Sequence, residues 1–133
     1  MSDNWVWDIE DMHNRYKVRD AIKKLDKEGL KHFLDFRIKF LEEELTELKE
    51  AKTAEDVVDA LIDLCVVAVG TLDAFEINSL KAWNEVHYAN MRKEVGIKES
   101  RPNPLGLPDL IKPEGWTAPS HENNHGLISQ IFE

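Results

Sequence analysis

Residues 55–75 are the stretch that most constrains how this chain can fold. Almost every side chain in it is apolar, and the run is long enough for about six turns of α-helix. A helix that is apolar on nearly every side must be buried, so we expect it to lie at the centre of a bundle. Asp59 and Asp63 are the exceptions. Acidic side chains are almost never buried unless they are paired, so these two aspartates, neighbours on one helical face, need a partner.

The preceding helix, expected over residues 30–51, supplies more negative charge. Glu44 and Glu47 can point the same way, as can Glu43 and Glu47, because residues three or four apart are neighbours on a helix. If the two helices pack antiparallel, four or five carboxylates converge, and they cannot all stay ionised unless a cation lies between them. Oxygen ligands suit Mg²⁺ or Mn²⁺, so the sequence predicts a divalent metal site. A lysine or arginine from a neighbouring helix is the alternative.

The rest of the pattern predicts an all-α protein of four to five helices. We expect a first helix over residues 3–17 and a later one over residues 78–94. The charged residues 18–29 form either a short helix or a loop, with a stop at Gly29. Thr53 is placed to cap the apolar helix. From residue 96 the helical pattern ends, and an extended, turn-rich tail holds all five prolines. Residues 120–133 are expected to be either mobile or a short terminal helix.

Length and charge limit the class of protein. The 133 residues predict one domain, 1–133, with a helical core over about 3–95 and the tail over about 96–133. A net charge of −9 argues against binding to a nucleic acid polymer, which needs a basic face. The longest apolar run is short of the ~20 residues that a membrane span requires, so no membrane partner is expected.

Cysteine usage and the first residues indicate the compartment. The single cysteine, Cys65, lies in an apolar run and cannot form an internal disulfide, which favours a reducing environment. The sequence begins Met-Ser-Asp-Asn without the apolar segment of a secretory signal. We therefore expect a cytoplasmic protein, in the host cytoplasm if its origin is viral.

A polar stripe on the helix at 78–94 has two interpretations. His87, Asn90 and Lys93 recur three residues apart and adjoin the apolar face. The stripe is either a solvated face or a phosphate-binding surface. In the second case the amide and the amine supply the donors and the positive charge that an acidic metal site lacks.

Three motifs in order resemble a known family. Glu43-Glu44-Leu-Thr-Glu47 is an E-E-x-x-E motif, followed by the acidic pair Asp59–Asp63 and then by Val86-His-Tyr-Ala-Asn-Met-Arg-Lys93. Together they resemble the all-α nucleoside triphosphate pyrophosphohydrolases, a superfamily that includes MazG, the dimeric dUTPases and phosphoribosyl-ATP pyrophosphohydrolase. The likeness covers about residues 30–118 and is nearest to short, single-domain MazG-like proteins of phages and bacteria. One branch of these, MazZ, removes dGTP.

One position departs from the family pattern. The second acidic motif in the family reads E-x-x-D, and Asp63 matches its aspartate. Ala60 stands where the glutamate is expected, and the acid lies one residue earlier as Asp59. A shift of one residue turns a side chain by about 100° around the helix. Asp59 is therefore expected to bind the metal differently, to bind it through water, or to serve another role.

The resemblance implies a reaction and a set of site residues. It implies a Mg²⁺- or Mn²⁺-dependent hydrolase that cleaves a (d)NTP to a (d)NMP and pyrophosphate, with dGTP as one candidate substrate. It implies catalytic roles for Glu43, Glu44, Glu47 and Asp63, and metal binding by these four with Asp59. Glu43 is either a ligand or the base that orients water. The residues expected to bind substrate are Lys93, Asn90, Arg92, His87, Met12, His13 and Trp83.

The alternatives come from the same superfamily and from outside it. Within it, the substrate is phosphoribosyl-ATP, dUTP or dCTP. Outside it, the chain is a non-catalytic helical interaction protein whose glutamates are solvated. A di-iron bundle needs Glu-x-x-His pairs, which the acidic segments lack. A long apolar helix in so short a chain leaves exposed surface, so we expect a homodimer or a homotetramer.

Overall fold

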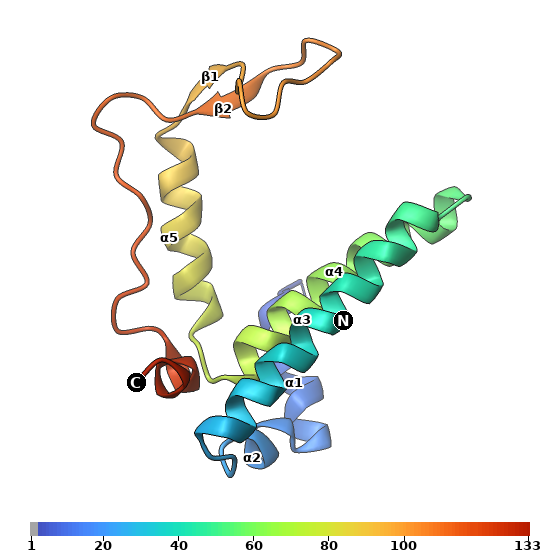
Figure 1. The fold of residues 1–133 in the computed structure, drawn as a ribbon, viewed down its shortest axis with the longest axis vertical. Helices are drawn as coiled ribbons and strands as arrows, with labels where there is room; N and C mark the ends of the chain where they lie inside the picture. Colours follow the sequence, from blue (N-terminus) through green and yellow to red (C-terminus); the bar gives the residue numbers. More distant parts are fainter. Residues whose placement is uncertain (1–2) are drawn as a thin grey trace. The chain divides into compact units, whose positions relative to one another are not determined.

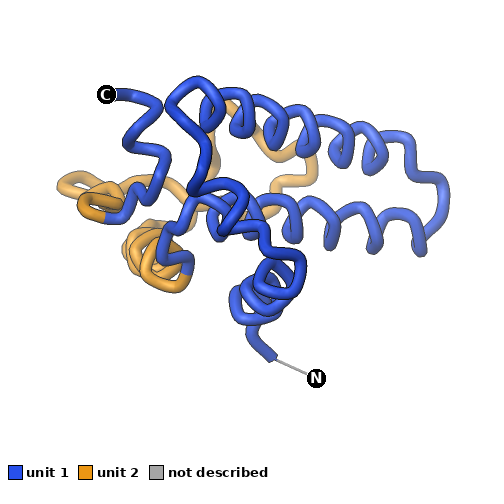
Figure 2. Tube along the Cα trace, turned by 90° about the horizontal axis from the view of Figure 1, so that it is seen from below, with its two compact units in different colours: residues 1–79, 124–133 blue, residues 80–123 orange. Residues whose placement is uncertain are grey.

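The computed structural model describes residues 3–133 and divides the chain into two compact units (Figure 2). The first unit runs to Ser79 and takes up the chain again at Asn124–Glu133, and the second is Leu80–Asn123. The helices of the first unit are α1 (Trp5–Tyr16), α2 (Val18–Ile22), α3 (Lys27–Glu50), α4 (Ala54–Ala74) and the 3₁₀-helix η1 (Gly126–Ile131). The chain is mostly helical, which confirms the all-α class.

Three short polar side chains fix where the long helices begin. Asn4 caps α1, Asp26 caps α3 and Thr53 caps α4. Each side chain accepts a hydrogen bond from the backbone N–H three residues later, at 3.1, 2.8 and 3.1 Å in that order. These bonds satisfy donors that a helix start leaves free. The expected cap at Thr53 is therefore confirmed.

Residues 18–29 contain a short helix, which resolves the alternative that the pattern left open. Lys17 joins α1 to α2 in the left-handed conformation, with φ 57°. The expected stop at Gly29 is wrong, because α3 begins at Lys27 and Gly29 lies in its first turn. The reason is the cap at Asp26, which bonds to the Gly29 N–H and starts the helix before the glycine.

α3 and α4 form a helical hairpin that runs side by side in Figures 1 and 2, and α1 packs against α4. The core gathers where η1 meets the end of α4. Its buried side chains are Ile22, Leu30, Ala74, Phe75, Ile77 and Ile131. The Leu127 N–H donates to the Phe75 carbonyl at 2.8 Å, which fastens η1 to the chain that follows α4.

α4 is more exposed than its composition predicts. Val58 is 62% exposed, Leu61 47% and Ile62 45%, so one side of this apolar helix faces solvent. α4 contacts α1, α2 and α3, as expected of a central helix, but the described residues leave this side of it uncovered. Among the described residues, no helix is both long enough and apolar enough to cross a membrane.

The second unit combines a helix with a small sheet. α5 (Ser79–Met91) leads into β1 (Glu94–Gly96), which pairs antiparallel with β2 (Asp109–Ile111). Two contacts tie its segments together. The Trp116 Nε1–H donates to the Ala89 carbonyl at 2.8 Å, and Arg101 pairs with Asp109 at 2.9 Å. The tail predicted as extended therefore contains the strand β2. At its end, η1 of the first unit is the short terminal helix that was one of the two alternatives for residues 120–133.

Candidate metal centre

Three carboxylates meet where α3 lies against α4. Glu44 and Glu47, one turn apart on α3, and Asp63 on α4 each offer an oxygen, and these three oxygens all lie within 4.8 Å of one another. The spacing of three residues brings the two glutamates to one face of α3. Packing of α3 on α4 then brings Asp63 to that face. The structure thus brings together three of the five carboxylates that the sequence singled out.

Glu44 is the buried member of the cluster. Only 9% of the residue is exposed, and its Oε2 atom is buried without a hydrogen-bond partner. Burial raises the pKa of the Glu44 carboxyl above its ordinary value, and the negative charges of Glu47 and Asp63 raise it further. The ionised form is therefore disfavoured unless a positive charge compensates it. A proton or a metal ion can supply that charge.

Glu43, Asp59 and Ala60 lie outside this set of close oxygens. Glu43 and Asp59 are exposed, whereas Ala60 is buried, with 3% of the residue exposed. The charge of Asp59 still contributes to the raised pKa of Glu44, so this aspartate acts on the cluster electrostatically. The predictions that Glu43 and Asp59 bind the metal remain predictions.

The donor set of the cluster suits a hard divalent cation. Its three groups are carboxylates, which favour Mg²⁺, Mn²⁺ or Ca²⁺ over metals that prefer sulfur or imidazole. The orphaned Glu44 Oε2 is an acceptor that a cation would satisfy. Within residues 3–133, no second group of three His, Cys, Asp or Glu side chains comes as close together. Glu44, Glu47 and Asp63 are therefore the residues that would hold a metal.

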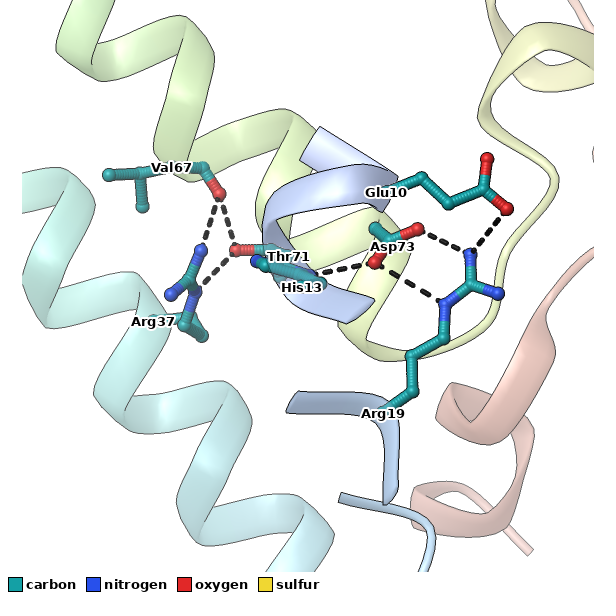
Figure 3. A network of polar contacts seen from close by, with 7 residues as sticks. All are labelled: Glu10, His13, Arg19, Arg37, Val67, Thr71 and Asp73. Atoms are coloured by element: carbon teal, nitrogen blue, oxygen red, sulfur yellow. Dashed lines mark hydrogen bonds and ion pairs between the residues drawn. The ribbon is translucent and has the colours of Figure 1, made fainter. Parts of the chain in front are cut away.

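His13, expected to bind substrate, lies in a buried polar network (Figure 3). Its Nδ1 is 2.7 Å from Asp73 Oδ2, and both residues are at most 5% exposed. Arg19 also donates two hydrogen bonds to Asp73 and lies 3.7 Å from Glu10. The network ties α1 and α2 to the end of α4. The substrate-binding role of His13 stays a prediction.

Arg37 joins α3 to α4 one to two turns away from the cluster. Its Nε donates to Thr71 Oγ1 at 2.9 Å, and its Nη2 donates to the Val67 carbonyl at 3.1 Å (Figure 3). A Cβ at Gly70 would lie 2.7 Å from that Nη2, so the glycine leaves room for the guanidinium. Burial lowers the pKa of Arg37. No periodic pattern in the sequence marked this contact.

Two surface hollows border α1. Met12, expected near the base, lines an open hollow of about 560 Å³ with Asp8, Asp11, Arg15 and Tyr16. A second hollow of about 250 Å³ lies between α1 and α4, lined in part by Trp5, Asp8 and Cys65. No sequence motif assigned Asp8 to a site. The signal that could have found it is its place three residues after Trp5, on the same face of α1.

The other substrate-binding predictions fall in the second unit. On α5, Trp83 is 70% exposed, and His87 and Asn90 are also exposed. Arg92, one residue past the end of α5, is exposed as well. The ammonium of Lys93 lies 5.4 Å from the centre of the Trp116 ring, and that of Lys112 lies 5.0 Å from it. Their roles toward phosphate stay predictions.

Comparison with known proteins agrees with this geometry. A cluster of carboxylates on a helical hairpin is compatible with an enzyme that uses a metal ion to hydrolyse phosphate compounds. The family described as PRA-PH, phosphoribosyl-ATP pyrophosphohydrolase, matches residues 16–90, which is more than half of the chain and includes the whole cluster. The chain belongs to this family, within the MazG-like all-α NTP pyrophosphohydrolase superfamily. A search of curated proteins gave no match.

Proposed function

We propose that this protein hydrolyses a nucleoside triphosphate to a nucleoside monophosphate and pyrophosphate, with Mg²⁺ or Mn²⁺ bound at Glu44, Glu47 and Asp63. Membership of the family supports a pyrophosphohydrolase. The observation that carries the metal is Glu44, whose buried Oε2 has no partner and whose pKa is raised. Two neighbouring carboxylates make that position more negative, so a divalent cation is the ligand that best fits it.

The reaction requires charge neutralisation and a proton acceptor. A bound divalent ion would screen the phosphate oxygens from the attacking water and from the cluster. Attack of water on one phosphorus of the α–β linkage breaks its bond to the bridging oxygen, releases pyrophosphate and sets free a proton. Glu43, exposed and adjacent to Glu44 in the chain, is our candidate for the carboxylate that orients the water and takes that proton.

The residues proposed to bind substrate belong to α1 of the first unit and, in the second unit, to α5 and the residues that follow it. We propose that Lys93 and Asn90 hold the phosphate tail, supported by Arg92 or His87, because the acidic cluster alone would repel a triphosphate. Met12 and His13 of α1, with Trp83 of α5, remain proposed substrate-binding residues. Asp59 is proposed to act on the metal through water, since it is exposed and influences Glu44 by charge.

Within this reaction we propose dGTP as the preferred substrate, with a role in control of the nucleotide pool. Phosphoribosyl-ATP, the substrate in the name of the matched family, is the second candidate. Both contain a purine and a triphosphate, and they differ in the purine with its substituents and in the sugar. The family match does not favour a non-catalytic helical protein.

A substrate screen tests the proposal. The full-length protein is incubated with each dNTP, each NTP and phosphoribosyl-ATP, with Mg²⁺, Mn²⁺ or EDTA, and both pyrophosphate and phosphate are measured. We expect metal-dependent release of pyrophosphate with matching amounts of monophosphate. Release of inorganic phosphate alone, or turnover that persists in EDTA, would contradict the reaction.

We also propose that the protein forms a homodimer or a homotetramer. Exposed apolar side chains gather on the outer side of α4, an arrangement that a second copy would cover. They include Val57, Val58 and Leu61, which are 37–62% exposed.

A further inference from the structure

The hollow between α1 and α4 has the composition of a small-molecule site. α1 contributes Trp5, Asp8 and Ile9, and α4 contributes Ile62, Cys65 and Val66, around a volume of about 250 Å³. We propose that this hollow binds the base of the substrate and that Asp8 selects guanine. The proposal rests on the proposed function, since it places a nucleotide substrate beside the cluster of Glu44, Glu47 and Asp63.

The size and walls of the hollow suit a flat, mostly apolar group. Ligand sites are concave and mainly apolar, with a few polar groups that set orientation, and complete drug-sized ligands occupy about 300–1,000 Å³. A hollow of about 250 Å³ fits a single base better than a whole nucleotide. Trp5 is 58% exposed and offers an indole face for stacking, whereas Ile9 is only 7% exposed and belongs to the packed interior.

Asp8 is the polar group that gives the hollow its selectivity. Its carboxylate makes no hydrogen bond or ion pair within residues 3–133. An ionised carboxylate only accepts hydrogen bonds and can accept two side by side. Guanine presents two adjacent donors, N1–H and the N2 amino group. Adenine and cytosine have an acceptor nitrogen beside their amino group, and thymine and uracil have a carbonyl on each side of one N–H. In each of these bases, an acceptor atom would face and repel the second oxygen of the Asp8 carboxylate.

The position of the hollow on α4 links it to the metal centre. Asp63 immediately follows Ile62 and precedes Val66 by three residues, so Val66 lies about 4.5 Å along the helix axis and about 60° around it from Asp63. The two sites thus occupy adjacent faces of one rigid helix. A sugar separates the base of a nucleotide from its α-phosphate, so a base in the hollow would leave the phosphates directed toward the cluster.

Cys65 allows binding to be measured without catalysis. It is the only cysteine of the chain, it lines the hollow and it is partly buried. The rate of its alkylation by iodoacetamide is measured in EDTA with millimolar dGMP, dAMP, dCMP or dTMP. We expect dGMP to slow alkylation more than the other three nucleotides. These products carry no pyrophosphate linkage, so the result does not depend on whether the protein hydrolyses triphosphates.

Two pairs of variants separate the hollow from its surroundings. Asp8→Asn replaces an acceptor with a donor, whereas the control Asp11→Asn alters a carboxylate that lines only the other hollow. Trp5→Ala removes the stacking face, and Trp7→Ala, at 60% exposure, removes a similarly exposed indole outside the hollow. Asp8→Asn and Trp5→Ala should abolish protection by dGMP, and both controls should retain it. Thermal melting verifies that each variant is folded.

Kinetics adds the link to the reaction. Loss of the charged hydrogen bonds in Asp8→Asn should lower kcat/KM for dGTP about 10- to 100-fold, mostly through KM, with smaller effects on the other dNTPs. Equal protection of Cys65 by all four monophosphates, or by none, would overturn the proposal. The proposal would also be overturned if Trp5→Ala or Asp8→Asn changed the oligomeric state and left the base preference unchanged. The hollow would then be part of a contact between two copies. If dGMP protects Cys65 but no triphosphate is cleaved, the proposed function fails and the base site stands.

Discussion

At the scale of single residues, Glu44 is the side chain whose placement most requires an explanation. A folded protein rarely buries a carboxylate oxygen without a partner, because the loss of hydration is not repaid. Here the oxygen is buried and two further carboxylates offer atoms within 4.8 Å. The arrangement costs stability when the site is empty of positive charge. It becomes favourable when a cation binds, and this is the basis of the proposed function.

The first prediction concerns pH. Because the folded state raises the pKa of Glu44 above its ordinary value of 4.5, the folded protein holds that proton more tightly than the unfolded chain. In EDTA, the free energy of unfolding should therefore fall as pH rises from 4.5 through the raised pKa, and then level off for this group. Glu44→Gln should flatten this fall, as followed by thermal melting across pH. Added Mg²⁺ or Mn²⁺ should restore stability to the wild type above that range.

If Glu44→Gln leaves the pH profile of melting unchanged, burial does not disfavour the Glu44 charge. Glu43→Gln is the matched control, since Glu43 is the neighbouring exposed glutamate of the same helix.

The second prediction concerns Asp73. Its side chain is 3% exposed and accepts hydrogen bonds from His13 and from Arg19, whose own side chain is 31% exposed. Removing one partner of a buried ion pair leaves the other charge without compensation. Asp73→Ala should therefore lower the free energy of unfolding by about 2–3 kcal/mol. The effect is smaller than for a fully buried pair because the Arg19 side chain keeps some contact with solvent. Urea denaturation measures the change. Asp35→Ala, at an exposed position of α3, should change stability by less than about 0.5 kcal/mol.

At the scale of elements, the α3–α4 hairpin both builds the core and positions the cluster. The capping residue Thr53 ends the short connection between the helices, which sets their register. That register brings Asp63 of α4 opposite Glu44 and Glu47 of α3. Any change that moves one helix along the other by a turn would separate the carboxylates by about 5.4 Å.

Helical periodicity predicted most of the helices because it is a local property. The expected long helices over 30–51 and 55–75 are observed at Lys27–Glu50 and Ala54–Ala74. Spacing also brought Glu44, Glu47 and Asp63 forward as neighbours. It could not rank Glu43 against Glu44, because a helix face is broad and the partner helix selects which side chains it meets.

Contacts between distant segments were not predicted. Asp73 lies 60 residues after His13 and 54 after Arg19, so no local pattern links them. The strands Glu94–Gly96 and Asp109–Ile111 were missed because three residues are too few to show alternation. The burial of α4 was overestimated because composition states how apolar a helix is and not which of its sides the rest of the chain covers.

The third prediction concerns the attachment of η1. A Cβ at Gly126 would lie 2.0 Å from the Phe75 carbonyl oxygen, which already accepts a bond from Leu127. Gly126→Ala should therefore destabilise the protein by more than the roughly 1–2 kcal/mol that its positive φ alone costs. Gly106→Ala is the control, because Gly106 also has positive φ and has nothing within 4 Å of the added Cβ. Similar melting temperatures for the two variants would argue against close docking of η1.

At the scale of the whole molecule, charge and apolar surface are unevenly distributed. Residues 80–123 contain equal numbers of basic and acidic side chains, so the net charge of −9 belongs to the rest of the chain, which contains the cluster. Bound metal would offset part of that charge. The apolar outer side of α4, where we propose an interface between copies, belongs to the same acidic unit as the cluster.

The fourth prediction tests that interface. Val58→Asp and Leu61→Asp place charges on side chains of α4 that are 62% and 47% exposed. Charged residues are unfavourable at the core of an interface, so both variants should sediment as smaller species than the wild type. Leu105→Asp is the control, because Leu105 is 79% exposed and lies far from α4 in sequence. A wild-type protein that sediments as a monomer at micromolar concentration would contradict the proposed assembly.

The central claim is that three carboxylates hold a catalytic metal, and pyrophosphate release by ligand variants tests it most directly. Glu47→Gln and Asp63→Asn keep side-chain shape and remove charge from the cluster, whereas Glu42→Gln removes an exposed charge of α3 outside it. With saturating Mg²⁺ and the best triphosphate of the screen, each cluster variant should release pyrophosphate at least about 100-fold more slowly while melting as a folded protein. Glu42→Gln should match the wild type. Full activity in either Glu47→Gln or Asp63→Asn would contradict the metal centre.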